Sequence, residues 1–66
     1  MQLTINGENH EYDGPLTVME LLEIMRLKNK FVAVERNFEV ISYKNYHDVT
    51  LDDGDQLEIV TLVGGG

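Results

Sequence analysis

The sequence ends in three glycines, Gly64, Gly65 and Gly66, which follow a strand-like apolar segment. Because glycine has no side chain, chemistry at this end would use the backbone and the terminal carboxyl group. An α-carboxyl group has a pKa of about 3.3–3.7, so at pH 7 it is an anion and a poor acyl electrophile. A partner enzyme that uses ATP could activate it as an acyl adenylate, which an amine or a sulfur donor can attack. Three extended residues span about 10 Å, enough to enter a narrow slot in such an enzyme.

Other residue types that could do chemistry do not form a known pattern. Asp52, Asp53 and Asp55 lack the further ligands and the distant glutamate of a calcium loop, and they are better explained as residues that cap backbone amides in a turn. His10 and His47 stand alone and the sequence has no cysteine, so no zinc-binding spacing exists. The sequence predicts no metal site, no bound cofactor and no catalytic residue of its own.

Size and charge narrow the classes of function. A chain of 66 residues is one small domain, and folding at this size buries only about 60% of the unfolded chain's surface. An enclosed substrate pocket would use up most of that core, so we expect a carrier or binding module rather than an enzyme. The net charge of −7, from 12 acidic and 5 basic residues, argues against a nucleic-acid partner, which clustered Lys and Arg would bind.

Hydropathy predicts a soluble, cytoplasmic protein. No apolar run approaches the roughly 20 residues that a membrane helix needs. The first residues lack the basic region and long apolar core of a signal peptide. We therefore expect no membrane association.

The first half of the chain predicts a hairpin followed by one helix. Leu3 and Ile5 alternate with polar residues as in a half-buried strand, and the Asn6-Gly7 pair that follows is a strong signal for a hairpin turn. Residues 8–12 would return antiparallel. Thr17 and Glu20 form a capping box, and apolar residues at helical spacing behind it predict a helix over 18–27.

The second half predicts three further strands. Residues 31–34 are apolar on both faces, as in a strand flanked on both sides of a sheet or covered by the helix. Residues 35–37 would form a turn and residues 40–41 a short strand. Residues 43–48 favour a turn or a short 3₁₀ segment, and residues 52–55 a tight turn before the last strand, over 56–63.

The last strand carries an unusual outward face. Leu57, Ile59 and Val63 alternate onto one side, as expected for packing against the helix. The other side begins with polar residues but continues with Val60 and Leu62. Two outward apolar residues directly before the glycines predict a partner-docking patch that positions them. A covering loop, or two singly exposed apolar residues, would explain the same pattern.

Several segments resemble the ThiS family, the small sulfur-carrier proteins of thiamine biosynthesis, within the ubiquitin-like β-grasp group. They are the strand ending in Asn6-Gly7, TVMELL at 17–22, VAVERN at 32–37, DGD at 53–55, and Gly65-Gly66. The resemblance covers essentially the whole chain; a third glycine, Gly64, stands where some relatives carry another small residue. It implies an α+β fold with a mixed four- or five-stranded sheet on one helix over 1–63, followed by a flexible tail over 64–66.

The same resemblance implies a function and partners. A ThiF-type, E1-like adenylyltransferase would use ATP to adenylate Gly66, which would become a thiocarboxylate with sulfur drawn from cysteine by a desulfurase. Thiazole synthase (ThiG) would then receive the sulfur, while Gly64 and Gly65 thread the slot and Val60 and Leu62 dock. Three alternatives remain open: a sulfur carrier for molybdopterin synthesis, a ubiquitin-like protein modifier, and an interaction domain with an inert tail.

Overall fold

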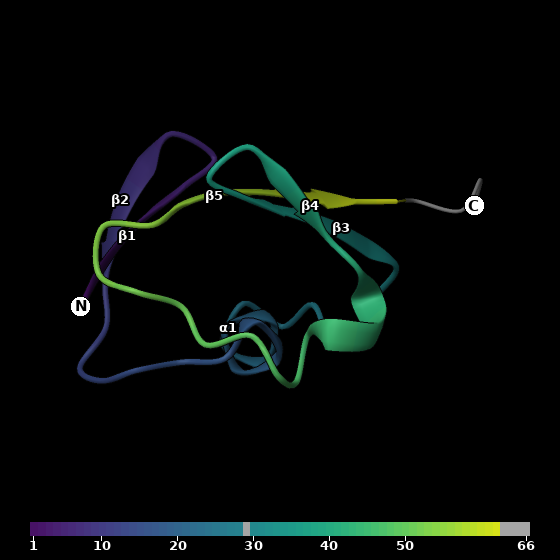
Figure 1. Cartoon of the computed structure of the whole chain (residues 1–66), viewed down its shortest axis with the longest axis horizontal. Helices are drawn as coiled ribbons and strands as arrows, with labels where there is room; N and C mark the ends of the chain where they lie inside the picture. The colour runs from purple at the N-terminus through teal and green to yellow at the C-terminus, as the bar shows by residue number, and fades with distance from the viewer. Residues whose placement is uncertain (29, 63–66) are drawn as a thin grey trace.

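The chain folds into one mixed sheet with a single α-helix packed on one of its faces (Figure 1). The computed structural model describes residues 1–28 and 30–62. In chain order the elements are β1 (Gln2–Ile5), β2 (Glu8–Glu11), α1 (Val18–Ile24), β3 (Val32–Arg36), β4 (Glu39–Ile41), the 3₁₀ helix η1 (Tyr43–Asn45) and β5 (Gln56–Thr61). This order agrees with the predicted β-grasp arrangement.

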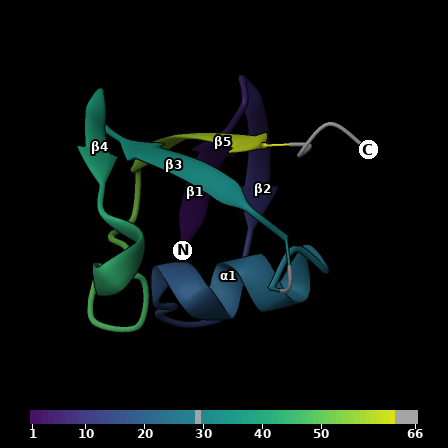
Figure 2. The same ribbon diagram turned by 90° about the vertical axis from the view of Figure 1, so that its right-hand side faces the viewer.

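The sheet has five strands in the order β2-β1-β5-β3-β4. The last strand is central: it runs parallel to β1 and antiparallel to β3, while β2 and β4 pair antiparallel at the two edges. Figure 2 shows α1 below the sheet, with the opposite face left open. The core between these two layers consists of Leu3, Ile5, Val18, Leu21, Leu22, Val32, Val34, Tyr46, Leu51, Leu57 and Ile59.

The helix begins as predicted and ends earlier than predicted. The amide of Glu20 donates to the Thr17 hydroxyl at 3.1 Å and the Glu20 carboxylate accepts from the Thr17 amide at 2.8 Å, which confirms the capping box. The predicted end at Leu27 was wrong, because α1 stops at Ile24. Arg26 takes a left-handed φ of 62°, and its amide and that of Leu27 bond back to helical carbonyls. This is a Schellman end, which usually has glycine at the position that Arg26 occupies.

The apolar run at 31–34 holds a strand flanked by β5 and β4, with Val32 and Val34 facing the core beside α1, whereas Ala33 is exposed and Phe31 is 80% exposed. One prediction needs correction around β3. The turn predicted over residues 35–37 begins later, because Arg36 is still part of β3. The turn residues are Asn37 and Phe38, both with positive φ.

The remaining predicted elements are close to those observed. The first turn has Asn6 and Gly7 at φ values of 51° and 83°, as the predicted hairpin requires. The last strand ends at Thr61; Val63 lies outside the described residues, so its predicted inward position stays a prediction. Within the described ranges, no helix has the length and apolar character that crossing a membrane requires.

Candidate functional site

The end of β5 presents the two apolar side chains predicted for docking. Val60 is 54% exposed and Leu62 is 55% exposed, whereas Leu57 and Ile59 on the opposite face of the strand are buried. The predicted outward exposure of Val60 and Leu62 is therefore confirmed, while their docking role stays a prediction. Gly64, Gly65 and Gly66, the predicted reactive tail, lie outside the described residues.

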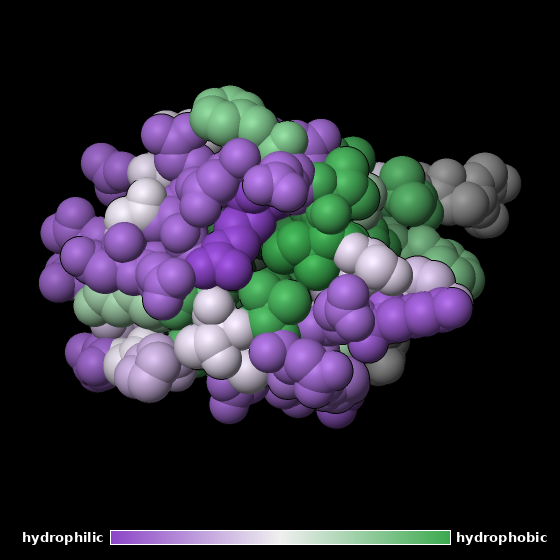
Figure 3. Space-filling view, in the orientation of Figure 1, coloured by the Kyte–Doolittle hydropathy of each residue, from purple (hydrophilic) through white to green (hydrophobic). Residues whose placement is uncertain are grey.

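Neighbouring strands extend this apolar surface with residues whose outward position the sequence did not predict. Ala33 is the register partner of Val60, and the Leu62 amide donates to the Phe31 carbonyl at 2.7 Å. Val40, which is 76% exposed, lies diagonally across from Ala33 on the same face. We call these five residues, Phe31, Ala33, Val40, Val60 and Leu62, the apolar strip. Figure 3 shows hydrophobic side chains gathered over the half of the molecule that holds β3, β4 and the end of β5.

A groove of about 570 Å³ lies next to this strip, on its helix side. Phe31, Tyr43 and Leu62 line it together with Lys28 and Lys30. Tyr46 closes the inner wall, and its hydroxyl donates to the Val32 carbonyl at 2.9 Å. Burial raises the pKa of the Tyr46 hydroxyl, so it is neutral at physiological pH. The end of β5 is therefore flanked by apolar surface on both sides.

Two asparagines fix β5 from its two sides. The Asn6 side chain accepts from the Ile59 amide at 2.8 Å and donates to the Ile59 carbonyl at 3.0 Å. On the other side, the Asn37 side-chain oxygen accepts from the Gln56 backbone amide at 2.9 Å, and the Asn37 backbone amide donates to the Gln56 carbonyl at 2.7 Å. Both asparagines lie in hairpin turns at positive φ. The strand that leads to the glycines is thus held in place by side chains as well as by the backbone ladder.

Asp55 anchors the beginning of β5. The residue is 6% exposed, and its carboxylate accepts from Arg36 Nε at 2.8 Å, from Asn37 Nδ2 at 3.0 Å and from the Asp52 amide at 2.8 Å. Burial alone would raise the pKa of Asp55, but these hydrogen bonds and the positive charge of Arg36 outweigh it and hold the pKa below its usual value. Sequence reasoning did not detect the Arg36 pair, because 19 residues separate the partners.

The acidic turn otherwise behaves as expected of turn residues. Asp53 accepts from the Gln2 amide at 2.6 Å, and the Asp52 carboxylate accepts from Arg36 at 2.8 Å. Within residues 1–28 and 30–62, no group of three or more His, Cys, Asp or Glu side chains is placed to hold a metal ion.

Comparison with known proteins identifies the family that shares this sequence and fold. The model of the ThiS family matches residues 3–66. The chain belongs to the ThiS family. The sulfur carrier protein ThiS of Bacillus subtilis is 45% identical over 65 residues, which are 97% of this chain and 98% of that protein. The crystal structure of a thiamine biosynthesis protein (ThiS) from Geobacter metallireducens matches with a TM-score of 0.84 at 38% identity, and covers 100% of both chains. The predicted ThiS family and β-grasp fold are confirmed.

A second kind of ThiS relative is much longer. A thiazole synthase of Paramagnetospirillum magneticum is 44% identical over all 66 residues, but this chain spans only 20% of that protein. A thiazole synthase of Magnetococcus marinus shows the same pattern, at 39% identity and 20% of its length. In these proteins a ThiS-like segment is part of a polypeptide named for thiazole synthesis, which links the family to that enzyme.

Proposed function

We propose that this chain is a sulfur carrier of thiamine biosynthesis and that Gly66 carries the sulfur. The observation that carries the proposal is the family match over residues 3–66, which includes the glycines together with the strand that presents them. The apolar strip beside the end of β5 and the two asparagine clamps support it. The clamps fix the position of β5, and the strip provides a contact surface directly before the predicted reactive end.

The chemistry follows from the carboxylate. Attack on ATP by the Gly66 carboxylate, in a ThiF-type adenylyltransferase, forms an acyl adenylate and releases pyrophosphate. A persulfide, which carries sulfur drawn from cysteine through a desulfurase, then displaces AMP and forms an acyl disulfide. A thiol reduces this disulfide, which leaves the thiocarboxylate and a new disulfide. Transfer of the sulfur to the intermediate held by thiazole synthase, with an oxygen from that intermediate or from water taking its place at the acyl carbon, regenerates the carboxylate. Glycine at 64, 65 and 66 leaves the acyl carbon free of side chains on its approach to each partner.

Docking is the part of this proposal that the described residues support directly. Val60 lies on β5 and Leu62 directly follows that strand, and each keeps about half of its surface exposed. An exposed apolar patch of this kind is typical of a protein-binding surface. We propose that proteins acting on Gly66 contact this patch, because contact there brings the tail to the same place each time.

Intact mass spectrometry tests the carrier function. The full chain is incubated with a ThiF-type enzyme, ATP, a cysteine desulfurase, cysteine and a thiol reductant, and a variant lacking Gly65 and Gly66 serves as the control. Replacing one carboxyl oxygen by sulfur adds about 16 Da, nearly the mass added by oxidation of Met1, Met19 or Met25 to the sulfoxide. Alkylation of the thiocarboxylate, followed by fragmentation, separates the two. Absence of a tail-localised shift with active enzymes would overturn the proposal.

A further inference from the structure

The face of the sheet opposite α1 is open and has no basic residue at the outward positions of its strands. The register and the burial pattern identify those positions as Gln2, Thr4, Asn9, Glu11, Ala33, Glu35, Val40, Gln56, Glu58 and Val60. Three of them are glutamates and none is Lys or Arg. The apolar strip occupies one end of this face, so the carboxylates of β3 and β5 lie directly beside it.

Two of these glutamates oppose each other. Glu35 of β3 and Glu58 of β5 are register partners, and like charges placed opposite one another on neighbouring strands destabilise a sheet. Among residues 1–28 and 30–62, neither carboxylate forms an ion pair. The arrangement therefore keeps two negative charges together without a paired cation from the described residues.

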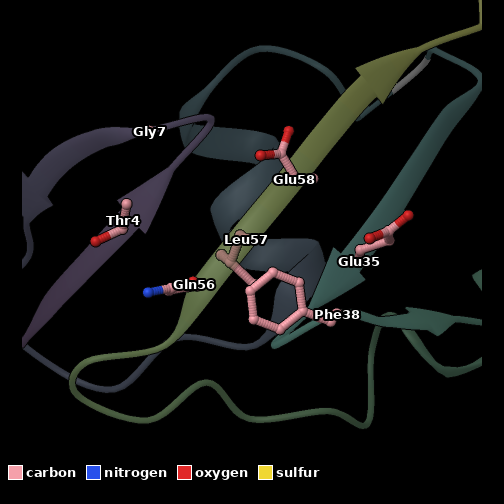
Figure 4. A pocket seen from close by; sticks show the side chains of 7 residues that line it. All are labelled: Thr4, Gly7, Glu35, Phe38, Gln56, Leu57 and Glu58. Carbon is pink, nitrogen blue, oxygen red and sulfur yellow. The ribbon is translucent and has the colours of Figure 1, made fainter.

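An exposed aromatic ring lies next to the same pair. Phe38 is 84% exposed and has a φ of 72°, a conformation that bulky residues rarely adopt. Figure 4 shows Phe38 extending from the β3–β4 turn over β5, with Glu35 and Glu58 projecting from neighbouring strands on the same face. The three side chains line one hollow of about 260 Å³. We call Glu35, Phe38 and Glu58 the acidic corner.

We propose that the acidic corner receives an Arg or Lys side chain from a partner protein whose apolar surface covers the apolar strip. A guanidinium group can bind a carboxylate through two parallel hydrogen bonds and can also stack on an aromatic ring. It would also supply the missing charge between Glu35 and Glu58. The inference rests on the proposed carrier function, because it takes the apolar strip as the surface where proteins acting on Gly66 bind.

Charge complementarity selects this occupant over a second copy of the chain. Two copies joined through this face would bring glutamates against glutamates, and each copy has a net charge of −7. A partner with a basic rim around an apolar patch would instead gain attraction at the corner and burial at the strip. Such complementarity acts on partner choice and association rate as much as on affinity.

The test is calorimetric titration of the full chain with the thiazole synthase of the same organism. We expect Glu35→Lys and Glu58→Lys to weaken binding roughly tenfold or more. The matched control is Glu11→Lys, which makes the same charge change on the same face but on edge strand β2; we expect it to bind within about threefold of wild type. Phe38→Gly should weaken binding without lowering the Tm, which a purely structural role would not produce.

Each other outcome overturns the proposal. Equal losses in all three Lys variants would show that net charge alone matters, and unchanged affinity in all of them would show that the corner is not contacted. Failure of the wild-type chain to bind, or its dimerisation through this face, would exclude the proposed occupant. If a Lys variant fails to fold, Glu35→Gln with Glu58→Gln replaces it, and this pair should flatten the dependence of Kd on salt.

Failure of this inference is distinguishable from failure of the carrier function. The mass-spectrometric assay is run on the same wild-type and variant proteins. Tail-localised sulfur on the wild type, together with unchanged binding of the corner variants, would overturn only the acidic corner. Absence of sulfur on the wild type would overturn the carrier function itself.

Discussion

The two hairpin turns of this protein begin alike and then differ. Each has an asparagine at φ near 50° whose side chain clamps the backbone of β5: Asn6 at Ile59 and Asn37 at Gln56. The next residue is Gly7 in the first turn and Phe38 in the second, at φ values of 83° and 72°. Glycine accepts that conformation without strain, whereas an aromatic residue does not.

The two turns share a backbone conformation, but only the first has residue types that suit this conformation throughout. The first turn combines the residues that best suit its backbone, so the fold alone explains its residue types. The second turn keeps the clamp but carries an exposed ring beside Glu35 and Glu58, where the fold gains little from it. Backbone strain that persists at an exposed position is a reason to look for function there.

Removing the clamps should have the largest effect on stability. Asn6→Ala and Asn37→Ala each remove two side-chain hydrogen bonds and leave a non-glycine residue at positive φ. We expect each to lower the free energy of unfolding by about 2–4 kcal/mol, measured by urea denaturation. Asn9→Ala is the control, because Asn9 is exposed on β2 and its loss should change stability by about 0.5 kcal/mol or less. A small effect of either clamp variant would show that the turns are not equivalent holders of β5.

Disrupting the hydrogen bonds of Asp55 should have the next largest effect on the free energy of unfolding, and this effect should depend on pH. Asp55→Asn replaces a carboxylate that accepts from Arg36, Asn37 and the Asp52 amide. Because hydrogen bonds to charged groups are worth about 1.5–3 kcal/mol, we expect a loss of about 2 kcal/mol at neutral pH.

The sign of the pH dependence follows from the lowered pKa of folded Asp55. The stabilisation is fully present above the unfolded-state pKa of about 3.9, and it is lost as pH falls through the lower pKa of the folded state. The free energy of unfolding of wild type should therefore fall more steeply in this acidic range than that of Asp55→Asn. Asp48→Asn, an exposed control, should keep the wild-type slope; parallel curves for all three proteins would contradict the role given to Asp55.

Replacing the second residue of each hairpin turn should change the free energy of unfolding by smaller amounts, and in opposite directions. Phe38→Gly removes a strained residue and should raise the free energy of unfolding by up to about 1 kcal/mol, which is a rise in Tm of about 4–8 °C for a domain of this size. Gly7→Ala should lower it by about 1–2 kcal/mol. Nothing lies within 4 Å of a Cβ at Gly7, so backbone strain alone would cause that loss. A fall in Tm for Phe38→Gly would mean that the ring stabilises the fold after all.

Local sequence signals predicted the parts of the fold that local physics decides. The Asn6-Gly7 pair predicted its turn, and Thr17 with Glu20 predicted the helix start. The helix end was missed because Arg26 takes the left-handed position where glycine is the usual signal. The second turn was misplaced for the same reason, since Phe38 gives no indication of positive φ.

The candidate site was only partly visible in the sequence. The alternation of residues along β5 correctly predicted that Val60 and Leu62 face outward, because strand periodicity is a local signal. Residues 31–34 were predicted as a strand flanked on both sides of a sheet or covered by the helix, but the exposure of Phe31 and Ala33 was not predicted, since apolar composition does not reveal which face lacks a covering layer. The opposition of Glu35 and Glu58 depends on register between distant strands, and the Asp55–Arg36 pair depends on tertiary packing, so neither has a local signal.

Substitutions at the proposed docking residues should have the smallest effect on stability. Val60→Ser and Leu62→Ser alter side chains that are about half exposed, on a strand that the asparagines clamp elsewhere. Each should change the free energy of unfolding by about 0.5 kcal/mol or less. Ile59→Ala, on the buried face of the same strand, should cost about 2–5 kcal/mol.

Val60→Ser and Leu62→Ser should nevertheless change the kinetics of the sulfur-loading reaction, although they hardly change stability. If the apolar strip is where partners bind, Val60→Ser and Leu62→Ser raise the KM for thiocarboxylate formation while kcat stays near the wild-type value, because the chemistry at Gly66 is unchanged once the complex forms. Thr50→Ser, an exposed change outside the sheet, is the control for surface mutation in general. A loss in kcat with unchanged KM would place Val60 and Leu62 in positioning the tail within the complex rather than in forming it. Both parameters at the wild-type value would remove the apolar strip from the docking surface and leave the glycines alone to direct recognition.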